Sequence, residues 1–356
     1  MKIVGIGMVC SEGQGIASLE KALQRGWKEP VTVVTPHIPG GAYPAYLVDF
    51  ANLPDKTLLK KIRRSDAVSK MSVLAAADAL ANSGIKDVTQ KKLGIILTTA
   101  FGPHVTTFNF LDDILDHGDA AVSPTTFSNS VHNAAASYIA MSLHIKGPTI
   151  TITQFQFSFQ SGLQLAQAWL DQGRCDYVLA GAVDQYGDVL GYVADHKLTT
   201  ARDGKIKPFT FKPTVQVPGE GAAFFLLGNK NGGEAYCTVN AIHTNDDPDH
   251  DQSVDINIID ANGMLPDESA YLPSLSKEIP TAAYSPLFGS MMIGSAFNMA
   301  VGALMLKQQR RYATPVQDNP HTIRLLTETG DGALAKIRCT GYNCYAERSV
   351  IYLTKA

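Results

Sequence analysis

Residues 149–170 change from an alternating to a helical pattern of apolar side chains. Ile150 and Ile152 alternate with threonines, which are β-branched, and this pattern favours a strand. Apolar side chains then recur at helical spacing over residues 163–170. The stretch FQSG at residues 159–162 therefore predicts a tight turn from a buried strand into a helix. Such turns raise one side chain into a pocket and direct free helix N–H groups at it, which suits an activated thiol or hydroxyl.

The side chain predicted at this turn is a phenylalanine, Phe159, which cannot act as a nucleophile. Phe155, Phe157 and Phe159 alternate, so on a strand they would share one face, with the intervening polar side chains on the other. Alternating apolar residues are usually core residues, and we interpret Phe155 and Phe157 in this way. Phe159 differs because we place it at the turn itself.

Segments with strand or helix patterns continue along most of the chain, before and after Ser161 and Gly162, and their order along the chain carries a resemblance. They are residues 2–26, 64–84, 132–148, 177–184, 198–209 and 219–227. In this order they resemble the β-ketoacyl synthases of the thiolase-like superfamily, whose nucleophile turn reads T-A-C-x-S-G. The resemblance implies an α/β fold, the five-layered αβαβα arrangement, with two pseudo-repeated halves in one compact unit. We expect the halves to be residues 1–230 and 231–356, with a hinge near GNKNGG at 228–233.

The resemblance also locates three catalytic positions, and all three are replaced. Phe159 stands at the cysteine, and Asn262 stands at the first histidine, between Ala261 and Gly263. The second histidine falls on Ser290 or Met291, depending on where one residue of slack is placed. Condensation in this family needs a thiolate and two imidazoles. A phenylalanine cannot form a thioester, and neither asparagine nor methionine can transfer a proton near neutral pH.

We therefore interpret the site as retained in structure and chemically silent. A cysteine elsewhere could in principle replace the lost one, but none of the five opens an apolar helix at a turn: Cys10, Cys175, Cys237, Cys339 and Cys344. Our hypothesis is that Phe159 fills the vacated nucleophile pocket and keeps an acyl chain out by its bulk. Gln160, one residue later, stands next to the position at which better-known polyketide chain length factors carry glutamine.

A chain that keeps the segments of this family but lacks its three catalytic side chains resembles a chain length factor. Chain length factors pair with a catalytic ketosynthase as a heterodimer and help to close the partner's acyl tunnel. Residues 99–110 and 123–136 resemble the versions found in bacterial aryl polyene pathways. We expect the chain to meet acyl carrier protein through that complex. Candidates for the pocket or for gating the tunnel are Phe157, Phe159, Gln160, Phe101, His104, Phe108 and Phe110; an ordinary packed helix is the alternative for the last four.

Two other functions stay open. The first is a ketosynthase-like enzyme with altered chemistry, such as a malonyl-ACP decarboxylase that uses Asn262 and oxyanion donors. The second is a homodimeric scaffold, because thiolase-like proteins bury a large interface between paired central strands. The decarboxylase would turn over without a partner, and the size of the isolated chain would reveal the scaffold.

Composition and charge argue against several kinds of partner and cellular location. The chain has 356 residues, of which 45% are hydrophobic, so it can bury a large core. Its net charge of −3 and the lack of a basic stripe argue against nucleic acid as a partner. The first residues predict a strand, and no apolar run reaches the length of a membrane span. Cysteines without CxxC spacing agree with a reducing, cytoplasmic location, and the histidines suggest no metal. We expect no cofactor.

Overall fold

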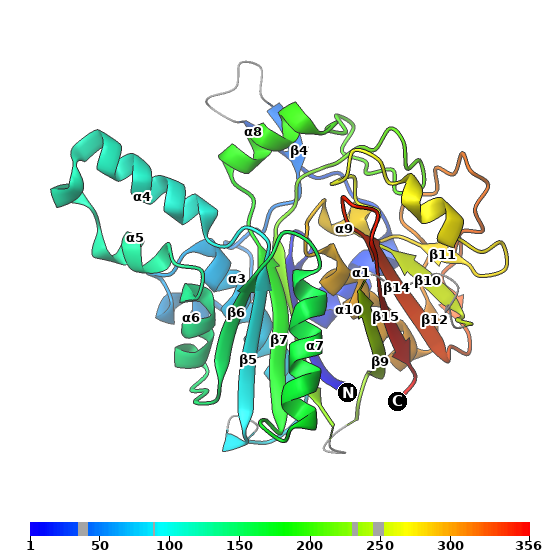
Figure 1. Cartoon of the computed structure of the whole chain (residues 1–356), viewed down its shortest axis with the longest axis horizontal. Coiled ribbons are helices and arrows are strands. Elements are labelled where there is room, and N and C mark those ends of the chain that lie inside the picture. Colours follow the sequence, from blue (N-terminus) through cyan, green and yellow to red (C-terminus); the bar gives the residue numbers. More distant parts are fainter. Residues whose placement is uncertain (35–41, 88–89, 230–233, 245–252) are drawn as a thin grey trace.

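The structure is a computed structural model that describes residues 1–34, 42–87, 90–229, 234–244 and 253–356. The hinge predicted at 228–233 falls mostly outside these residues, and so does the division between the two predicted halves. Within the described residues, strands and helices alternate as the sequence predicts, which confirms the α/β class (Figure 1).

Ten strands follow one another in a single mixed sheet, in the order β11-β10-β14-β15-β9-β1-β8-β7-β5-β6, and β2 pairs with β1. The strands from the first part of the chain are β1 (Lys2–Cys10), β2 (Gly13–Gln14), β5 (Leu93–Thr99), β6 (Thr149–Thr153), β7 (Tyr177–Asp184) and β8 (Gly221–Gly228). Those from the second part are β9 (Cys237–Thr244), β10 (Ile256–Ile259), β11 (Thr281–Ala282), β14 (Lys336–Tyr342) and β15 (Arg348–Thr354). The two parts join where Lys2 and Ile3 of β1 pair with Thr238 and Cys237 of β9.

The remaining elements are helices and two short hairpins. The α-helices are α1 (Ile16–Arg25), α2 (Lys56–Lys61), α3 (Ala67–Asn82), α4 (His104–His117), α5 (Pro124–Asn129), α6 (Ala134–Ser142), α7 (Ser158–Asp171), α8 (Asp188–Lys197), α9 (Ser285–Phe288) and α10 (Gly294–Gln308). Two 3-10 helices are described, η2 (Asp119–Ala121) and η4 (Ser269–Ser274). The hairpins pair β3 (Val31–Val34) with β4 (Ala42–Ala45), and β12 (Arg310–Arg311) with β13 (Gly330–Asp331).

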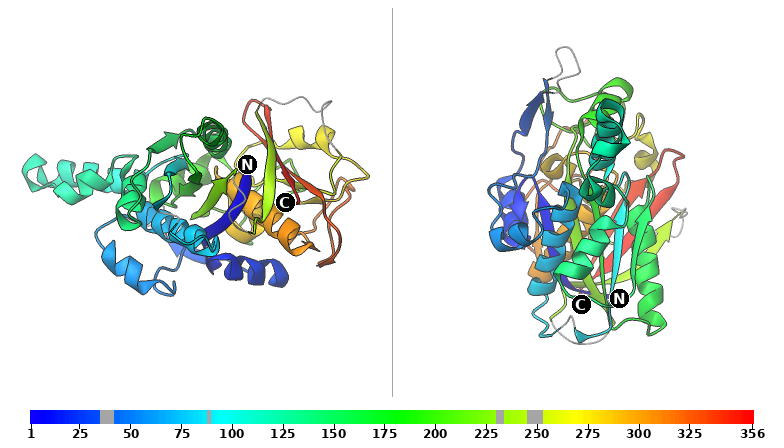
Figure 2. Two further views of the ribbon diagram at one scale, coloured as in Figure 1. Left: turned by 90° about the horizontal axis from the view of Figure 1, so that it is seen from below. Right: turned by 90° about the vertical axis from the view of Figure 1, so that its left-hand side faces the viewer.

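Helices form layers on the two parts of the sheet. Helices α3 and α6 pack on the outer face of the first part, while α7 and α10 lie between the first and second parts (Figures 1 and 2). On the outer face of the second part, the described residues place η4 and loops against β10 and β14. There Arg338 of β14 donates a hydrogen bond to the carbonyl of Ser274 at 3.5 Å.

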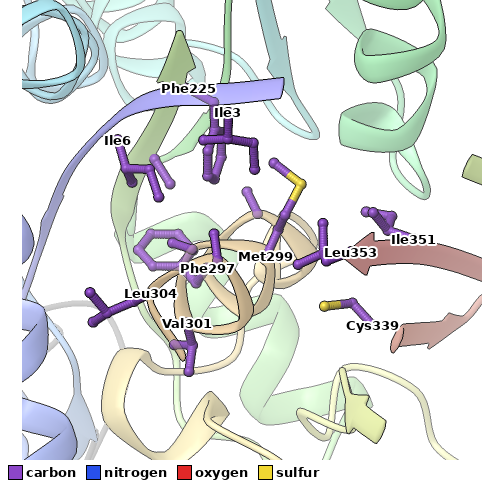
Figure 3. Close-up of a cluster of buried hydrophobic side chains, with 14 of the residues drawn as sticks. Ile3, Ile6, Phe225, Phe297, Met299, Val301, Leu304, Cys339, Ile351 and Leu353 are labelled. Atoms are coloured by element: carbon purple, nitrogen blue, oxygen red, sulfur yellow. The ribbon is translucent and has the colours of Figure 1, made fainter. Parts of the chain in front are cut away.

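The largest core cluster surrounds α10, in which every residue from Ser295 to Leu306 is buried. A helix that is buried on all sides belongs to the interior of a layered fold. Figure 3 shows its side chains meeting Ile3 and Ile6 of β1, Phe225 of β8, and residues of β14 and β15. This core joins the first and second parts of the sheet, and the candidate site lies at its edge.

One part of the chain departs from this compact arrangement. Helix α4 has no buried residue, and with α5 it extends away from the rest of the molecule (Figure 1). The neighbouring strand β6 is the last strand of the sheet, with its outer edge unpaired in the described residues. An open strand edge of this kind is a template for pairing with another chain.

Candidate functional site

The turn between β6 and α7 forms as predicted, but a different residue occupies it. Strand β6 ends at Thr153, and α7 begins at Ser158. Phe157, just before the helix, has φ 60° and ψ 20°, a left-handed conformation that is rare for a bulky residue. The prediction of Phe159 at the turn is therefore wrong by two residues. The reason is that Phe159 joins Leu163 and Ala166 on one buried helical face, so the helix begins earlier than its aliphatic residues suggest.

The three phenylalanines consequently have three different environments rather than one strand face. Phe159 lies in the core, 1% exposed, with its ring 5.6 Å from that of Phe225. Phe155 is 64% exposed, which contradicts its interpretation as a core residue, and its ring lies 5.5 Å from Phe101. Phe157 is half-buried. Of the three, only Phe157 lies at the turn itself.

Phe157 lies between two hollows at the N-terminal end of α7. The smaller has a volume of about 40 Å³ and a polar lining, which includes Gln160, Asp260 and Asn262. The larger, open hollow of about 700 Å³ includes Phe155 and Cys344 in its wall. Gln160 is buried and accepts a hydrogen bond from the Ser295 hydroxyl at 3.4 Å. The structure thus brings Phe157, Gln160 and Asn262 together around one small polar space.

The side chain of Asn262 is fully engaged. Its Nδ2 donates to the carbonyl of Met291 at 2.8 Å and to Oδ1 of Asp260 at 3.4 Å. Its Oδ1 accepts from the backbone N–H of Met264 at 3.0 Å. The amide therefore acts as a local brace between two loops.

Ser290 and Met291, the two candidates for the second histidine position, also have structural contacts. Ser290 is buried, its hydroxyl donates to the carbonyl of Asn262, and it accepts from the N–H of Val217 at 3.0 Å. Met291 is 3% exposed and belongs to the main core cluster. Sequence reasoning missed Met292, which lines three separate hollows around the site. Nothing in the apolar pattern distinguished it from its neighbour.

Two buried carboxyls, of Asp260 and Glu268, lie in the wall of the smaller hollow. Burial raises the pKa of Glu268 to about 8, against hydrogen bonds from the N–H groups of Gly263 and Asn262 that lower it. Burial likewise raises the pKa of Asp260 to about 7, although the Asn262 and Asn298 amides and the Ser295 N–H hydrogen-bond to it. Near neutral pH both carboxyls therefore hold a proton for part of the time, because their buried surroundings disfavour negative charge.

The cysteines divide clearly between core and surface. Cys10, Cys175, Cys237 and Cys339 are buried, and burial raises the pKa of each thiol, to about 12 for Cys10. Cys344 is exposed in the wall of the open hollow, where its N–H donates to Oε1 of Gln156 at 3.2 Å. Sequence reasoning did not place Cys344 near the site, because the contact joins residues 188 apart in the chain.

The four residues proposed for the partner-facing helix lie along the α4 arm and its base. Phe101 precedes α4, and its ring lies 6.1 Å from that of His104, which in turn lies 6.5 Å from Phe108. Phe108 is 37% exposed, whereas Phe110 packs on Phe127 of α5 at 5.5 Å. Burial lowers the pKa of His104, so this imidazole is neutral at pH 7. No residue of α4 is fully buried, but His104 is half-buried and Phe110 packs on Phe127, so the alternative of an ordinary packed helix stays open.

Comparison with known proteins identifies the family. The family model for the β-ketoacyl synthase N-terminal domain matches residues 2–231. The chain is 24% identical over 236 residues to 3-oxoacyl-[acyl-carrier-protein] synthase 2 of Coxiella burnetii, and 24% identical over 230 residues to Nodulation protein E of Rhizobium meliloti. Each alignment covers 63% of this chain and 56% of the relative, so the chain spans little more than half the length of these relatives.

Solved structures match over the whole chain. The ishigamide ketosynthase/chain length factor has a TM-score of 0.84 at 15% identity, covering 100% of this chain and 98% of that one. A β-ketoacyl synthase from Burkholderia phymatum has a TM-score of 0.80 at 17% identity, with full coverage of both chains. A type II polyketide acyl-carrier protein in complex with its ketosynthase includes a chain that matches with a TM-score of 0.81 at 13% identity.

This chain belongs to the β-ketoacyl synthase family and has its thiolase-like fold. The family acts in fatty acid and polyketide biosynthesis, and this chain is a ketosynthase-like member of it. None of the helices in the described residues combines the length and apolar character that a membrane crossing requires.

Proposed function

We propose that this chain is a chain length factor, the non-catalytic member of a heterodimer with an active β-ketoacyl-ACP synthase. The observation that carries the proposal is Phe157 at the turn before α7, in left-handed geometry. A nucleophile at this point would face the N–H groups of the helix. A phenyl ring at the same point cannot accept an acyl group.

The other catalytic positions support the same proposal. Asn262 uses its only donor group on Met291 and Asp260, so it has no free N–H for a substrate carbonyl. This arrangement speaks against the malonyl-ACP decarboxylase alternative, which relies on Asn262 as an oxyanion donor. Met291 is buried in the core.

The surface next to the site supports a partner. Strand β6 ends the sheet, and Ile150 on it is 40% exposed. Apolar side chains around this edge and along the α4 arm are also exposed: Phe108, Leu111, Leu115, Phe127, Val131, Met141 and Phe155. Exposed apolar side chains that gather into a patch mark a protein interface, and we propose that these do so. The proposed partner is a catalytic ketosynthase, with acyl carrier protein reached through the complex.

Within that complex, we propose that Phe101, His104, Phe108 and Phe110 shape the partner's acyl tunnel and set the product length. The likeness of residues 99–110 and 123–136 to aryl polyene proteins suggests a conjugated polyene product. The ketosynthase/chain length factor among the structural neighbours has the same fold at low identity.

The test is co-expression of this chain with a ketosynthase from the same pathway, followed by purification through a tag on one subunit. Malonyl-dependent elongation of a carrier-bound acyl chain is then measured with each subunit alone and with both together. We expect a one-to-one complex whose activity disappears when the partner's cysteine is replaced. Elongation or malonyl decarboxylation by this chain alone would overturn the proposal.

The same surface allows a homodimer, so the oligomeric state needs its own measurement. Light scattering on the isolated chain distinguishes a monomer from a scaffold dimer. A variant with Ile150→Lys and Leu115→Asp should lose the heterodimer, whereas Val34→Asp, at a 72% exposed residue of β3, should keep it. A stable homodimer that does not exchange with the ketosynthase would favour the scaffold instead.

A further inference from the structure

An open hollow of about 540 Å³ lies at the end of the sheet opposite to the candidate site. It is bordered by the segments that lead into the parallel strands β5, β6 and β7, at the lower edge of the molecule in Figure 1. The turn at Phe157 follows the other end of β6. Basic side chains dominate its lining, so we name it the basic hollow; they are Lys91, Lys92, His144, Lys146 and Arg174.

The positive charge of the basic hollow is not balanced by acidic groups within it. Its lining, as far as the structure describes it, includes no carboxylate. None of the ion pairs between described residues uses one of these lysines or Arg174. The Asp176 carboxylate, two residues after Arg174, accepts the backbone N–H of Lys92 at 3.3 Å. All five basic residues are exposed, so their long side chains can turn toward a ligand in the hollow.

Backbone hydrogen bonds fix the segments that carry these charges. The N–H of Ile95 donates to the carbonyl of Pro148 at 2.8 Å, and the N–H of Asp176 donates to the carbonyl of Lys92 at 2.7 Å. These bonds also engage carbonyl oxygens at the rim, whereas ammonium and guanidinium groups are donors without an acceptor. The basic hollow is therefore a fixed frame that suits a negatively charged ligand rich in acceptors.

Two of the basic side chains have a defined local setting. The guanidinium carbon of Arg174 lies 4.8 Å from the ring centroid of Trp169, a cation–π contact that limits its freedom. His144 follows the end of α6 with φ 57°, a position at which glycine is usual. The turn itself does not need an imidazole, because glycine adopts this conformation at lower cost.

We propose that the basic hollow binds a compact polyphosphate group, that is, two or more linked phosphates of a small molecule. Phosphate oxygens accept hydrogen bonds, and arginine and lysine are the side chains that bind them best. One phosphate carries about −1.5 to −2 at pH 7, so two linked phosphates match three lysines and an arginine better than one does. The volume lies within the ~300–1,000 Å³ of small-molecule sites.

Free pyrophosphate and a nucleoside diphosphate share this group, and the ligands of the experiment separate them. The inference goes beyond the proposed function and does not rest on it, because the hollow and the turn at Phe157 lie at opposite ends of β6.

Calorimetry on the full chain, without divalent cations, compares pyrophosphate, ADP, phosphate and citrate. We expect pyrophosphate to bind at least about tenfold more tightly than phosphate, the effect of one additional charge-assisted hydrogen bond. Citrate should also bind at least about tenfold more weakly, because a carbon chain spreads its charges. Tighter binding of ADP than of pyrophosphate would identify a nucleotide as the ligand, and weaker or equal binding the free polyphosphate. Equal binding of phosphate, citrate and pyrophosphate, or no binding of pyrophosphate up to millimolar concentration, would overturn the proposal.

Variants localise the effect. Replacing both Lys92 and Lys146 by glutamine should weaken pyrophosphate binding at least about tenfold. Replacing Lys21 and Lys277 by glutamine removes the same charge at exposed positions outside the hollow and should leave binding unchanged. Equal losses in these two double variants would contradict the assignment. His144→Gly should weaken binding without lowering the melting temperature, because it removes a donor where the backbone favours glycine.

Discussion

The side-chain amide of Asn262 donates a hydrogen bond to the backbone carbonyl of Met291 at 2.8 Å. This contact joins the loop after β10 to the loop before α10, the two segments in which the resemblance places the family's histidines. Both residues are buried. The amide of Asn262 is thus a structural link between the two loops.

This link gives a first prediction about stability. Asn262→Ala should lower the free energy of unfolding by about 1–3 kcal/mol, because it leaves the buried Met291 carbonyl and Met264 N–H without their partners. Denaturant unfolding measures the change. Asn109→Ala, at an exposed position on α4, should stay within about 0.5 kcal/mol of the parent. If Asn262→Ala were as stable as the parent, the amide would be free to serve a ligand.

Phe159 and Phe157 should respond to truncation with losses of different size. Phe159→Ala removes a ring that is 1% exposed and packed on Phe225, which should cost about 3–5 kcal/mol. Phe157→Gly removes a half-buried ring and also relieves a left-handed backbone, which costs a non-glycine residue about 1–2 kcal/mol. We therefore expect Phe157→Gly to be clearly the milder change. Equal losses in the two unfolding curves would mean that Phe157 is a core residue.

The buried carboxyls predict how stability depends on pH. In the folded chain the pKa values of Glu268 and Asp260 are raised to about 8 and about 7 by burial, above their ordinary values of 4.5 and 3.8. The folded state therefore holds more protons than the unfolded state between about pH 4 and pH 8. Stability from this pair is complete at the acidic end of that range and is lost as the pH rises through it.

Glu268→Gln tests this origin, because its Oε1 can still accept from the N–H groups of Asn262 and Gly263 without titrating. The decline in melting temperature between pH 5.5 and 8.5 should shrink by roughly half, since one of the two groups no longer contributes. Glu328→Gln, at an exposed position, should leave the pH profile unchanged. A Glu268→Gln profile that overlays the parent's would rule out this carboxyl as the cause.

The sequence predicts the strand, turn and helix around Phe157 because a period of two gives way to a helical period within a few residues. It misplaces the turn by two residues because Phe159, an aromatic residue, belongs to the buried face of the helix, which begins at Ser158. The left-handed φ of Phe157 has no signal in the apolar pattern, since φ above zero usually accompanies glycine or asparagine.

The contacts that define the site are harder to read from the chain. Gln156 and Cys344 are 188 residues apart, and Asn262 and Met291 are 29 apart, and no local pattern encodes either pairing. Family resemblance locates Asn262 for the first histidine and Ser290 or Met291 for the second, because Ala261, Gly263, Gly294 and Ala296 are retained. It does not locate Met292 or Cys344, which reach the site only through the folded arrangement of β14, β15 and α10.

Thiol labelling distinguishes the cysteines. A maleimide added briefly at pH 7 should modify Cys344 alone, because it is exposed while burial protects the other four and raises their pKa. Intact-mass analysis should show one adduct, which disappears in Cys344→Ser. A pantetheine-linked crosslinker that modified Cys344→Ser in this chain would reveal a second accessible thiol and contradict the buried assignment of the others.

Alanine variants at the base and along the α4 arm test whether this arm sets product length. Phe101→Ala, His104→Ala and Phe108→Ala remove consecutive members of one row of rings, while Phe110 packs on Phe127 within the arm itself. Because α4 buries none of its residues, Phe108→Ala should change the free energy of unfolding of this chain by less than about 1 kcal/mol. We expect at least one of the first three variants to lengthen the product in the ketosynthase complex, as read by mass spectrometry of the released chains.

Phe110→Ala is the matched comparison: it should loosen the contact between α4 and α5 and weaken the complex more than it alters product length. Unchanged product lengths in all four variants, with the heterodimer intact, would remove the gating role and leave the arm as a docking element alone.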